Sequence, residues 1–179
     1  MAITTGTNDG IKFEYMLGGG PPHMVTMEEK YDSTKGWLVG CILDVDTSGR
    51  LFRHSGVGAN ATTGAFAVAM APMACTADGS AETVAIMITP NTVFSAKVAH
   101  LTTGSAVTQP TQVGNTYQLC CSATLGTSLN YCIELATTAS AGAHIIGMKD
   151  ASGTAYGRLY FVFNGTYRAQ SPFGMYTSG

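Results

Sequence analysis

The sequence predicts an all-β protein, a compact β-barrel or β-sandwich of about ten short strands with extended N- and C-terminal arms. Three observations support this fold class. No window of about ten residues or more carries the apolar stripe of an amphipathic helix. Short runs of alternating apolar and polar residues recur along the chain, and Gly, Asn, Asp or Pro separates each run from the next. The spacing of these runs is typical of a barrel or a sandwich.

The first predicted strand covers residues 12–17. Phe13, Tyr15 and Leu17 occupy alternate positions, so the pattern places these three side chains on one face of the strand. The glycines and prolines at 18–22 end the strand, because glycine readily adopts turn conformations and proline cannot donate a backbone hydrogen bond.

Residues 36–44 form the longest apolar run without alternation, which indicates a strand covered on both faces. We therefore expect this strand at the centre of a sheet. The Asp-Thr-Ser-Gly sequence at 46–49 has the composition of a tight turn, and it leads into a strand at 51–54. Shorter runs predict the remaining strands at 23–27, 65–70, 83–89, 92–98, 117–123, 130–135, 144–149 and 158–164, the last with Leu159, Phe161 and Phe163 on its inward face.

Residues 1–11 and 166–179 show no apolar period. Each segment taken alone fits a frayed terminus as well as an arm that gains order from a neighbouring molecule, and we interpret both as arms. The β-rich domain between the arms spans 12–165. A connection rich in Thr, Ser, Gln and Pro at 101–114 marks a possible subdivision of this domain.

Charged residues are scarce, since the chain has 9 basic and 11 acidic side chains where about 45 charged residues are usual for this length. The large core-forming residues Leu, Ile, Val and Phe make up only about a fifth of the chain. Thr and Ser make up about another fifth. A neutral, hydroxyl-rich surface with a net charge of -2 lacks the repulsion that keeps monomers apart. We therefore expect part of the apolar burial to occur against other chains.

The same composition argues against several classes of partner. A chain with a pI near 6.0 and no run of Lys or Arg lacks the charge that nucleic-acid phosphates require. The sequence predicts no transmembrane helix and no signal peptide, so we expect neither a membrane partner nor Sec export. The cysteines follow neither disulfide nor zinc-site spacing, and we interpret them as small core residues in a reducing compartment: Cys41, Cys75, Cys120, Cys121 and Cys132.

No catalytic, cofactor or metal motif stands out, and the four histidines are scattered without metal-ligand spacing. Asp44 and Asp46 lie two residues apart, which places both carboxylates on one strand face, but an Asp before a turn usually accepts hydrogen bonds from the turn backbone. Trp37 lies in the most apolar run, and we interpret it as a core residue. We therefore expect no enzyme, no cofactor and no metal. A pocket where Asp44, Asp46 or His54 meets another titratable group would reverse this expectation.

The order of segments from residue 36 to residue 98 is distinctive. An apolar strand with glycine leads to an Asp-Gly turn, a Gly-Ala strand, a small-residue strand, a polar Asp-Gly loop and a second apolar strand, at 36–40, 46–49, 57–59, 67–69, 78–79 and 84–94. This order resembles the small β-rich decoration, or cement, proteins of tailed-bacteriophage heads. The segments 112–119 and 156–163 also resemble phage structural proteins.

The resemblance implies a protein without catalysis that binds the outer surface of an assembled capsid, often as a trimer, and clamps neighbouring subunits of the major capsid protein. It also implies an N-terminal arm that adds a strand to a capsid sheet. In this chain the arm is residues 1–11, with Ile3, Thr4, Thr5 and Ile11 as the expected capsid contacts. The protein would then lie on the outer capsid surface of the virion after assembly in the host bacterial cytoplasm.

An alternative from another class stays open, namely a carbohydrate-recognising β module of a virion fibre or spike. An exposed Trp37, or tyrosines grouped on one face of a sheet, would favour this module. A cement protein instead requires a neutral surface that docks onto a larger particle.

Overall fold

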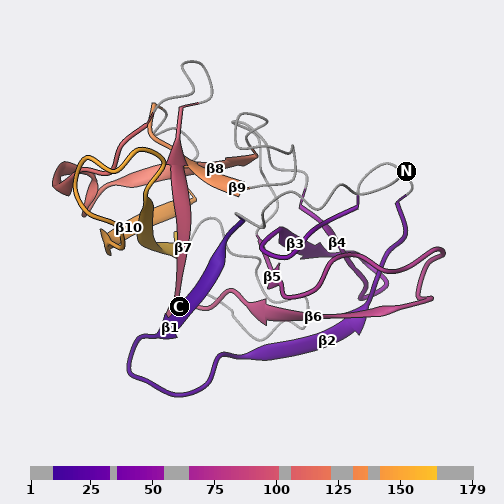
Figure 1. The fold of residues 1–179 in the computed structure, drawn as a ribbon. Helices are drawn as coiled ribbons and strands as arrows, with labels where there is room; N and C mark the ends of the chain where they lie inside the picture. Colours follow the sequence, from indigo (N-terminus) through magenta and orange to yellow (C-terminus); the bar gives the residue numbers. More distant parts are fainter. Residues whose placement is uncertain are drawn as a thin grey trace.

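The computed structural model describes residues 10–32, 36–54, 65–100, 106–121, 131–136 and 142–164. Within these ranges the protein has eleven β-strands, one short 3-10 turn and no α-helix, which confirms the predicted all-β class. The same ranges contain no helix that is long and apolar enough to cross a membrane. The strands form two groups that lie side by side (Figure 1).

Five strands of the first group close into a barrel. From β7 (Thr92–Ala99) the sheet continues through β11 (Arg158–Phe163), β10 (Ala143–Met148) and β8 (Thr116–Cys121) to β9 (Tyr131–Glu134). The last two residues of β7 pair in parallel with β9, which closes the ring, whereas the other barrel pairs are antiparallel. A further strand, β1 (Lys12–Met16), pairs with the first half of β7.

The second group is an antiparallel sheet of five strands. Its order is β2 (Met24–Glu28), β6 (Glu82–Met87), β5 (Ala67–Ala69), β3 (Ile42–Val45) and β4 (Leu51–Arg53). An isolated bridge between Glu29 and Leu51 brings the end of β2 back to β4, so the two edges of this sheet meet at one corner. The sheet is therefore strongly curled.

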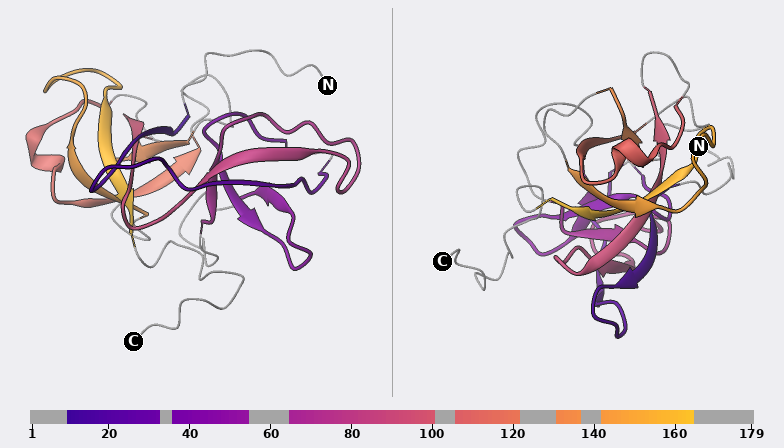
Figure 2. Two further views of the ribbon diagram at one scale, coloured as in Figure 1. Left: turned by 90° about the horizontal axis from the view of Figure 1, so that it is seen from below. Right: turned by 90° about the vertical axis from the view of Figure 1, so that its left-hand side faces the viewer.

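The chain crosses from one group to the other at two adjacent places. The connections β1–β2 and β6–β7 run next to each other, and Figure 2 (left) shows the barrel and the second sheet joined by them. The Leu17 N–H donates to the Asn91 carbonyl at 2.7 Å, and the Met87 N–H donates to the His23 carbonyl at 2.8 Å. These backbone hydrogen bonds hold the two crossings together.

One apolar core spans both groups of strands. In β11 the alternate residues Leu159, Phe161 and Phe163 are fully buried, which confirms their predicted inward face. Phe94 of β7 lies 6.1 Å from Phe161 and 5.4 Å from Phe163 between ring centroids, so an aromatic cluster fills the barrel. Trp37 is also buried, as its apolar surroundings in the sequence predicted.

The structure corrects two predicted strands. Residues 36–44 do not form one long strand, because Gly40 adopts a φ of 83° in a turn and β3 begins only at Ile42. Phe13, Tyr15 and Leu17 do not all lie on one face of a regular strand, because β1 ends at Met16 and its pairing with β7 shifts by one residue between Phe13 and Tyr15. This bulge leaves Tyr15 exposed, whereas Phe13 packs against the core.

The chain changes from the second sheet to the barrel between β6 and β7. The possible subdivision at 101–114 stays a prediction, since 101–105 lie outside the described residues. Residues 106–109 pack against the β10–β11 connection, where Thr108 donates from Oγ1 to the Ala151 carbonyl at 2.6 Å and accepts at its own carbonyl from Gly153 N–H at 2.7 Å.

Candidate interaction surface

The predicted arm contacts fall at two different places relative to the described chain. Ile3, Thr4 and Thr5 lie outside the described residues. Ile11 is described, and it is only 2% exposed within the core. Its N–H donates to the Gly40 carbonyl at 3.1 Å. In this conformation Ile11 therefore anchors the N-terminal segment to the protein and has no surface to offer to a partner.

The anchor depends on a close approach of two backbone segments. A Cβ atom at Gly40 would lie 2.6 Å from the Ile11 carbonyl oxygen, and a Cβ atom at Gly10 would lie 3.0 Å from the Val39 carbonyl oxygen. Real Cβ atoms do not come as close to a backbone atom as the first of these distances, so only glycine fits at Gly40. The Gly40 φ of 83° adds a second reason, since this conformation is strained for L residues with a side chain.

Arg158 of β11 binds the same N-terminal segment from the barrel side, through Gly10. Its Nη2 donates to the Gly10 carbonyl at 3.1 Å, while its Nη1 donates to the Ser95 carbonyl at 3.1 Å and to Ser95 Oγ at 3.2 Å. The Arg158 side chain is buried. We call Gly10, Ile11, Gly40, Ser95 and Arg158 the arm root, because they tie the N-terminal segment to both groups of strands.

A second feature, at the opposite end of β1 from the arm root, is an exposed apolar turn between β1 and β2. Three of the six exposed large apolar side chains in the described ranges flank it, namely Tyr15, Leu17 and Met24. Between them Gly18, Gly19 and Gly20 have φ values of 88°, 83° and 93°, and a Cβ atom on any of the three would meet open space. Figure 2 (right) shows this connection projecting from the body of the molecule. We call residues 15–24 the projecting turn.

No family model, no curated protein and no solved structure matches this chain.

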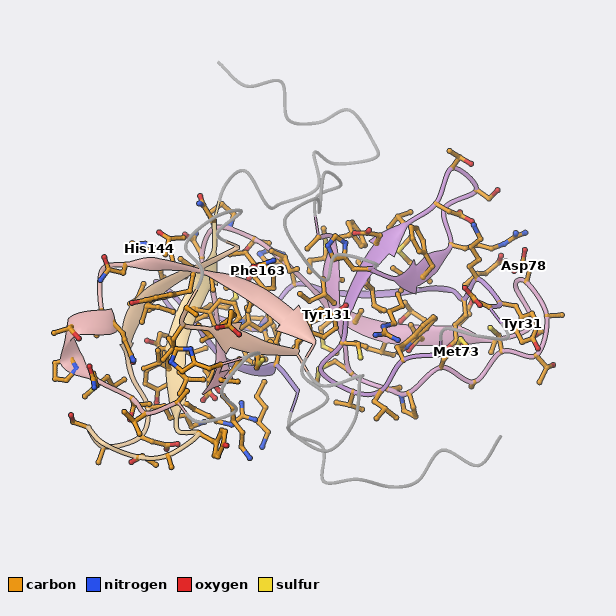
Figure 3. All side chains as sticks on the ribbon, turned by 90° about the horizontal axis from the view of Figure 1, so that it is seen from above. Tyr31, Met73, Asp78, Tyr131, His144 and Phe163 are labelled. Carbon is orange, nitrogen blue, oxygen red and sulfur yellow. The ribbon has the colours of Figure 1, made fainter. Side chains whose placement is uncertain are left out.

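Two titratable groups singled out from the sequence come together, but in the interior. His54 Nδ1 lies 2.7 Å from Asp44 Oδ2, and both side chains are buried. Asp44 pairs with Phe52 across the β3–β4 hairpin, which makes His54 its diagonal neighbour on the same face. The Tyr131 hydroxyl of β9 donates to the His54 carbonyl at 2.8 Å, and Figure 3 places Tyr131 between the two groups of strands.

This burial decides what the pair can do. A general acid or base has to reach the reacting atoms of a substrate, and a His54 side chain that is 1% exposed reaches only other protein atoms. Asp44 and His54 therefore converge in the interior of the protein. The backbone carbonyl of His54, beside this pair, joins the β3–β4 hairpin to the barrel through the Tyr131 hydroxyl.

Asp46 has the turn role that its sequence context predicted. Its Oδ1 accepts hydrogen bonds from the Ser48 N–H at 2.8 Å and the Arg50 N–H at 2.9 Å. Burial acts to raise the Asp46 pKa, but these N–H groups and the charges of Lys30 and Arg50 together hold the pKa below its ordinary value. Asp46 thus stabilises the β3–β4 turn and does not join Asp44 in a site.

Charged side chains gather at the end of the second sheet far from the barrel. Arg50 Nε lies 3.3 Å from Glu28 Oε2, and Arg50 Nη1 lies 3.3 Å from Asp78 Oδ2. The Asp78 carboxylate also accepts a hydrogen bond from the Tyr31 N–H at 2.7 Å. Figure 3 labels Asp78 and Tyr31 at this end. These exposed ion pairs form a solvated surface, whereas the projecting turn has no Asp, Glu, Lys or Arg.

Glu29 is a structural residue that no pattern in the sequence indicated. Glu29 is fully buried, and its Oε2 accepts from the Ala74 N–H at 2.8 Å and the Cys75 N–H at 2.6 Å. Burial, followed by the hydrogen bond and charge of Glu29, raises the pKa of the Cys75 thiol to about 11. Three of the cysteines are buried as predicted, namely Cys41, Cys75 and Cys132. The described part of the chain holds no group of three metal-ligating side chains.

The arm root and the projecting turn were both missed at the sequence level. In its sequence context Arg158 looks like an ordinary polar residue of a strand, and nothing near it in the sequence indicates a contact with Gly10. For the turn a signal was present, because Leu17 and Met24 flank a segment with three consecutive glycines, which have no side chains to cover them.

Proposed function

We propose that the protein is a non-enzymatic virion structural protein that binds the outer surface of a phage head and stabilises it by bridging neighbouring subunits of the major capsid protein. The observation that carries this proposal is the arm root. It fixes the N-terminal segment by hydrogen bonds to Gly40 on one side and Arg158 on the other. A segment that binds a partner under load has to be attached to the body in this way.

The arm root distributes load over the whole fold. Ile11 joins the segment to the second sheet through Gly40, and Arg158 joins it to β7 and β11 of the barrel. A force on the arm therefore acts on many backbone hydrogen bonds at once. In a bridging protein, several weak contacts by one oligomer add up through effective concentration. The scarcity of charge makes such contacts tolerant of salt, since few of them are screened ion pairs.

The proposal includes a partner and a place. The partner is the major capsid protein, the protein itself acts as a homotrimer or another homo-oligomer, and no nucleic acid or membrane takes part. The protein joins the outer surface of the head during assembly in the host bacterial cytoplasm. The small number of large core-forming residues supports binding to the capsid protein and to further copies of the chain, because it favours burial of apolar surface against other chains.

Deletion of Met1 to Thr7 tests the proposal. We expect the truncated chain to fold with an unchanged urea midpoint, because the arm root begins only at Gly10. We expect its binding to expanded phage heads to fall at least about tenfold, because strand addition by the arm is lost. Co-sedimentation with empty expanded heads measures the binding. Unchanged occupancy of the heads by the truncated chain would count against the arm.

A carbohydrate-binding module remains a second candidate because of one aromatic contact. Tyr15 of β1 and Tyr160 of β11 lie with their ring centroids 6.0 Å apart at an interplanar angle of 67°. Tyrosines grouped on one sheet face favour sugar binding. The other expected support is missing, since Trp37 is 1% exposed. Glycan-array binding that Tyr160→Ala abolishes would favour this candidate over the cement protein.

A further inference from the structure

We infer that the projecting turn is a second contact of this protein with the capsid, and that it docks its apolar side chains on an uncharged apolar patch of the major capsid protein. This inference rests on the proposed function and assigns a surface to it. Three observations carry it: the exposure of the apolar residues, the three glycines between them, and the connection of the turn to the arm root through β1.

The exposed apolar side chains are concentrated rather than scattered. Leu17 and Tyr15 are each 44% exposed and Met24 is 55% exposed, all within ten residues of sequence. Tyr15 lies near the end of β1, Leu17 directly after β1 and Met24 at the start of β2. Single exposed apolar residues are normal on a protein surface, but a group of them on one feature marks an interaction site. Burial of such side chains against a partner supplies the main favourable free energy of association.

The glycines between these side chains add accessible backbone. At Gly18, Gly19 and Gly20 the positive φ values account for the choice of glycine, since packing leaves room for a Cβ atom at each position. The turn is held in place by the Gly19 N–H, which donates to the Met16 carbonyl at 3.0 Å, and by the Leu17 hydrogen bond to Asn91. A partner can therefore approach the backbone closely between two apolar flanks.

The turn is continuous with the arm root along the chain. Ile11 ends the anchored segment, β1 follows directly, and the turn comes at the far end of β1. A partner that holds the arm is thus bound to the same strand that carries the turn. This continuity favours the capsid protein as the occupant over an unrelated partner.

The chemistry of the turn favours a neutral protein surface over a lipid bilayer. No Lys or Arg occurs from Tyr15 to Met27, so the turn has no such cation to meet anionic headgroups. It also has no tryptophan, a residue that often anchors a loop at a membrane interface. The exposed ion pairs made by Arg50 lie on the second sheet, outside this surface.

Charge substitutions at matched exposure test the inference. Leu17→Glu and Met24→Glu place a carboxylate on the turn. Met70→Glu and Val113→Glu make the same change at two apolar side chains that are each 42% exposed elsewhere on the surface. We expect all four variants to keep the urea midpoint of the wild type, because every substituted side chain is already exposed. We expect only the two turn variants to lose binding to expanded heads, by at least about tenfold, because the carboxylate would be desolvated at the contact.

The outcomes separate the inference from the function on which it rests. If the wild type binds heads and the turn variants bind equally well, the second contact is wrong and the proposed function stands. If the control variants lose binding as much as the turn variants, the effect is general and the inference is again wrong. If the wild type does not bind heads at all, the proposed function fails as well.

In that last case two further measurements identify the true occupant of the turn. Sedimentation of the wild type, but not of Leu17→Glu, with neutral phosphatidylcholine vesicles would assign the turn to a membrane. A wild-type oligomer that Leu17→Glu converts to a monomer in analytical ultracentrifugation would assign it to a second copy of this chain. Either result overturns the capsid contact.

Discussion

At the scale of single residues, Gly40 is the described glycine at which an added Cβ atom would come closest to a neighbouring atom. Its φ of 83° is one obstacle to any side chain, and the distance of only 2.6 Å that a Cβ atom would have to the Ile11 carbonyl oxygen is another. We expect Gly40→Ala to lower the free energy of unfolding by about 3 kcal/mol, because it combines left-handed strain with a backbone clash. Urea denaturation measures the change.

Gly49→Ala is the matched control for this prediction. Gly49 has a φ of 81°, but a Cβ atom there meets open space. We expect a loss of about 1 kcal/mol from the strained conformation alone. Equal losses in the two variants would show that the close approach of Gly40 to Ile11 has no energetic weight.

The Asp46 carboxylate predicts a specific dependence of stability on pH. Its pKa is lowered below the ordinary value of 3.8, so the unfolded chain binds the proton more tightly than the folded chain. The contribution of Asp46 to stability is therefore present above pH 3.8 and is lost as the pH falls through the lower pKa of the folded state.

Asp46→Asn isolates this contribution, because the amide oxygen can still accept the two turn hydrogen bonds. We expect the variant to be less stable than the wild type at pH 7 and the difference to shrink as the pH is lowered from about 4 to about 2. Urea midpoints of both proteins at several pH values measure it. A difference that stays constant down to the lowest pH would contradict the lowered pKa.

At the scale of elements, Arg158 is the side chain on which the arm root depends. Arg158→Met keeps the length and apolar stem of the side chain but removes the donor to the Gly10 and Ser95 carbonyls. We expect a loss of about 2–4 kcal/mol in unfolding free energy, because buried acceptors lose charge-assisted hydrogen bonds. We also expect faster hydrogen exchange at the Ile11 amide, which native-state exchange measured by NMR detects.

Arg50→Met provides the contrast for this experiment. Arg50 makes two ion pairs of 3.3 Å, with Glu28 and Asp78, but these pairs are exposed to solvent. Exposed pairs contribute little, so we expect a loss below about 1 kcal/mol and no change at the Ile11 amide. The prediction for Arg158 fails if both arginine variants have the same effect on that amide.

The elements themselves show how far the sequence determines this fold. The inward face of Leu159, Phe161 and Phe163 was predictable, because a regular strand translates alternation directly into faces. The exposure of Tyr15 was not, because it follows from a bulge in the pairing of β1 with β7. Hydrophobic alternation assumes one residue per partner residue, and a bulge breaks this assumption without any local signature in the apolar pattern.

The arm root could not be predicted from the sequence either. Its members come from four distant parts of the sequence, and each of them has an ordinary role in its own segment. Gly40 looks like a residue of an apolar strand, and Arg158 looks like the polar start of another. Only the three-dimensional approach of Gly10 to both of them gives them their shared function. By contrast, the turn role of Asp46 is local, and for that reason the sequence predicted it.

At the scale of the whole molecule, the continuous core determines how the protein unfolds. The apolar cluster includes residues of both groups of strands, and Tyr131 joins β9 of the barrel to the carbonyl of His54 after β4. Neither group can separate without exposing apolar surface of the other. We therefore expect the barrel and the second sheet to unfold in one cooperative transition, as is usual for a single core.

Two residues report on the two halves of this transition. Trp37 is the only tryptophan, and its carbonyl accepts from the Met73 N–H beside the second sheet, so its fluorescence follows that sheet. Cys132 is a buried cysteine in β9, so its alkylation, resolved by mass spectrometry of its peptide, follows the barrel. We expect both probes to give the same urea midpoint. We also expect Tyr131→Phe to move both midpoints together by an amount that corresponds to about 1 kcal/mol. Separate midpoints would show instead that the protein consists of two independently folding units, in which case a load on the arm root would not reach the whole fold.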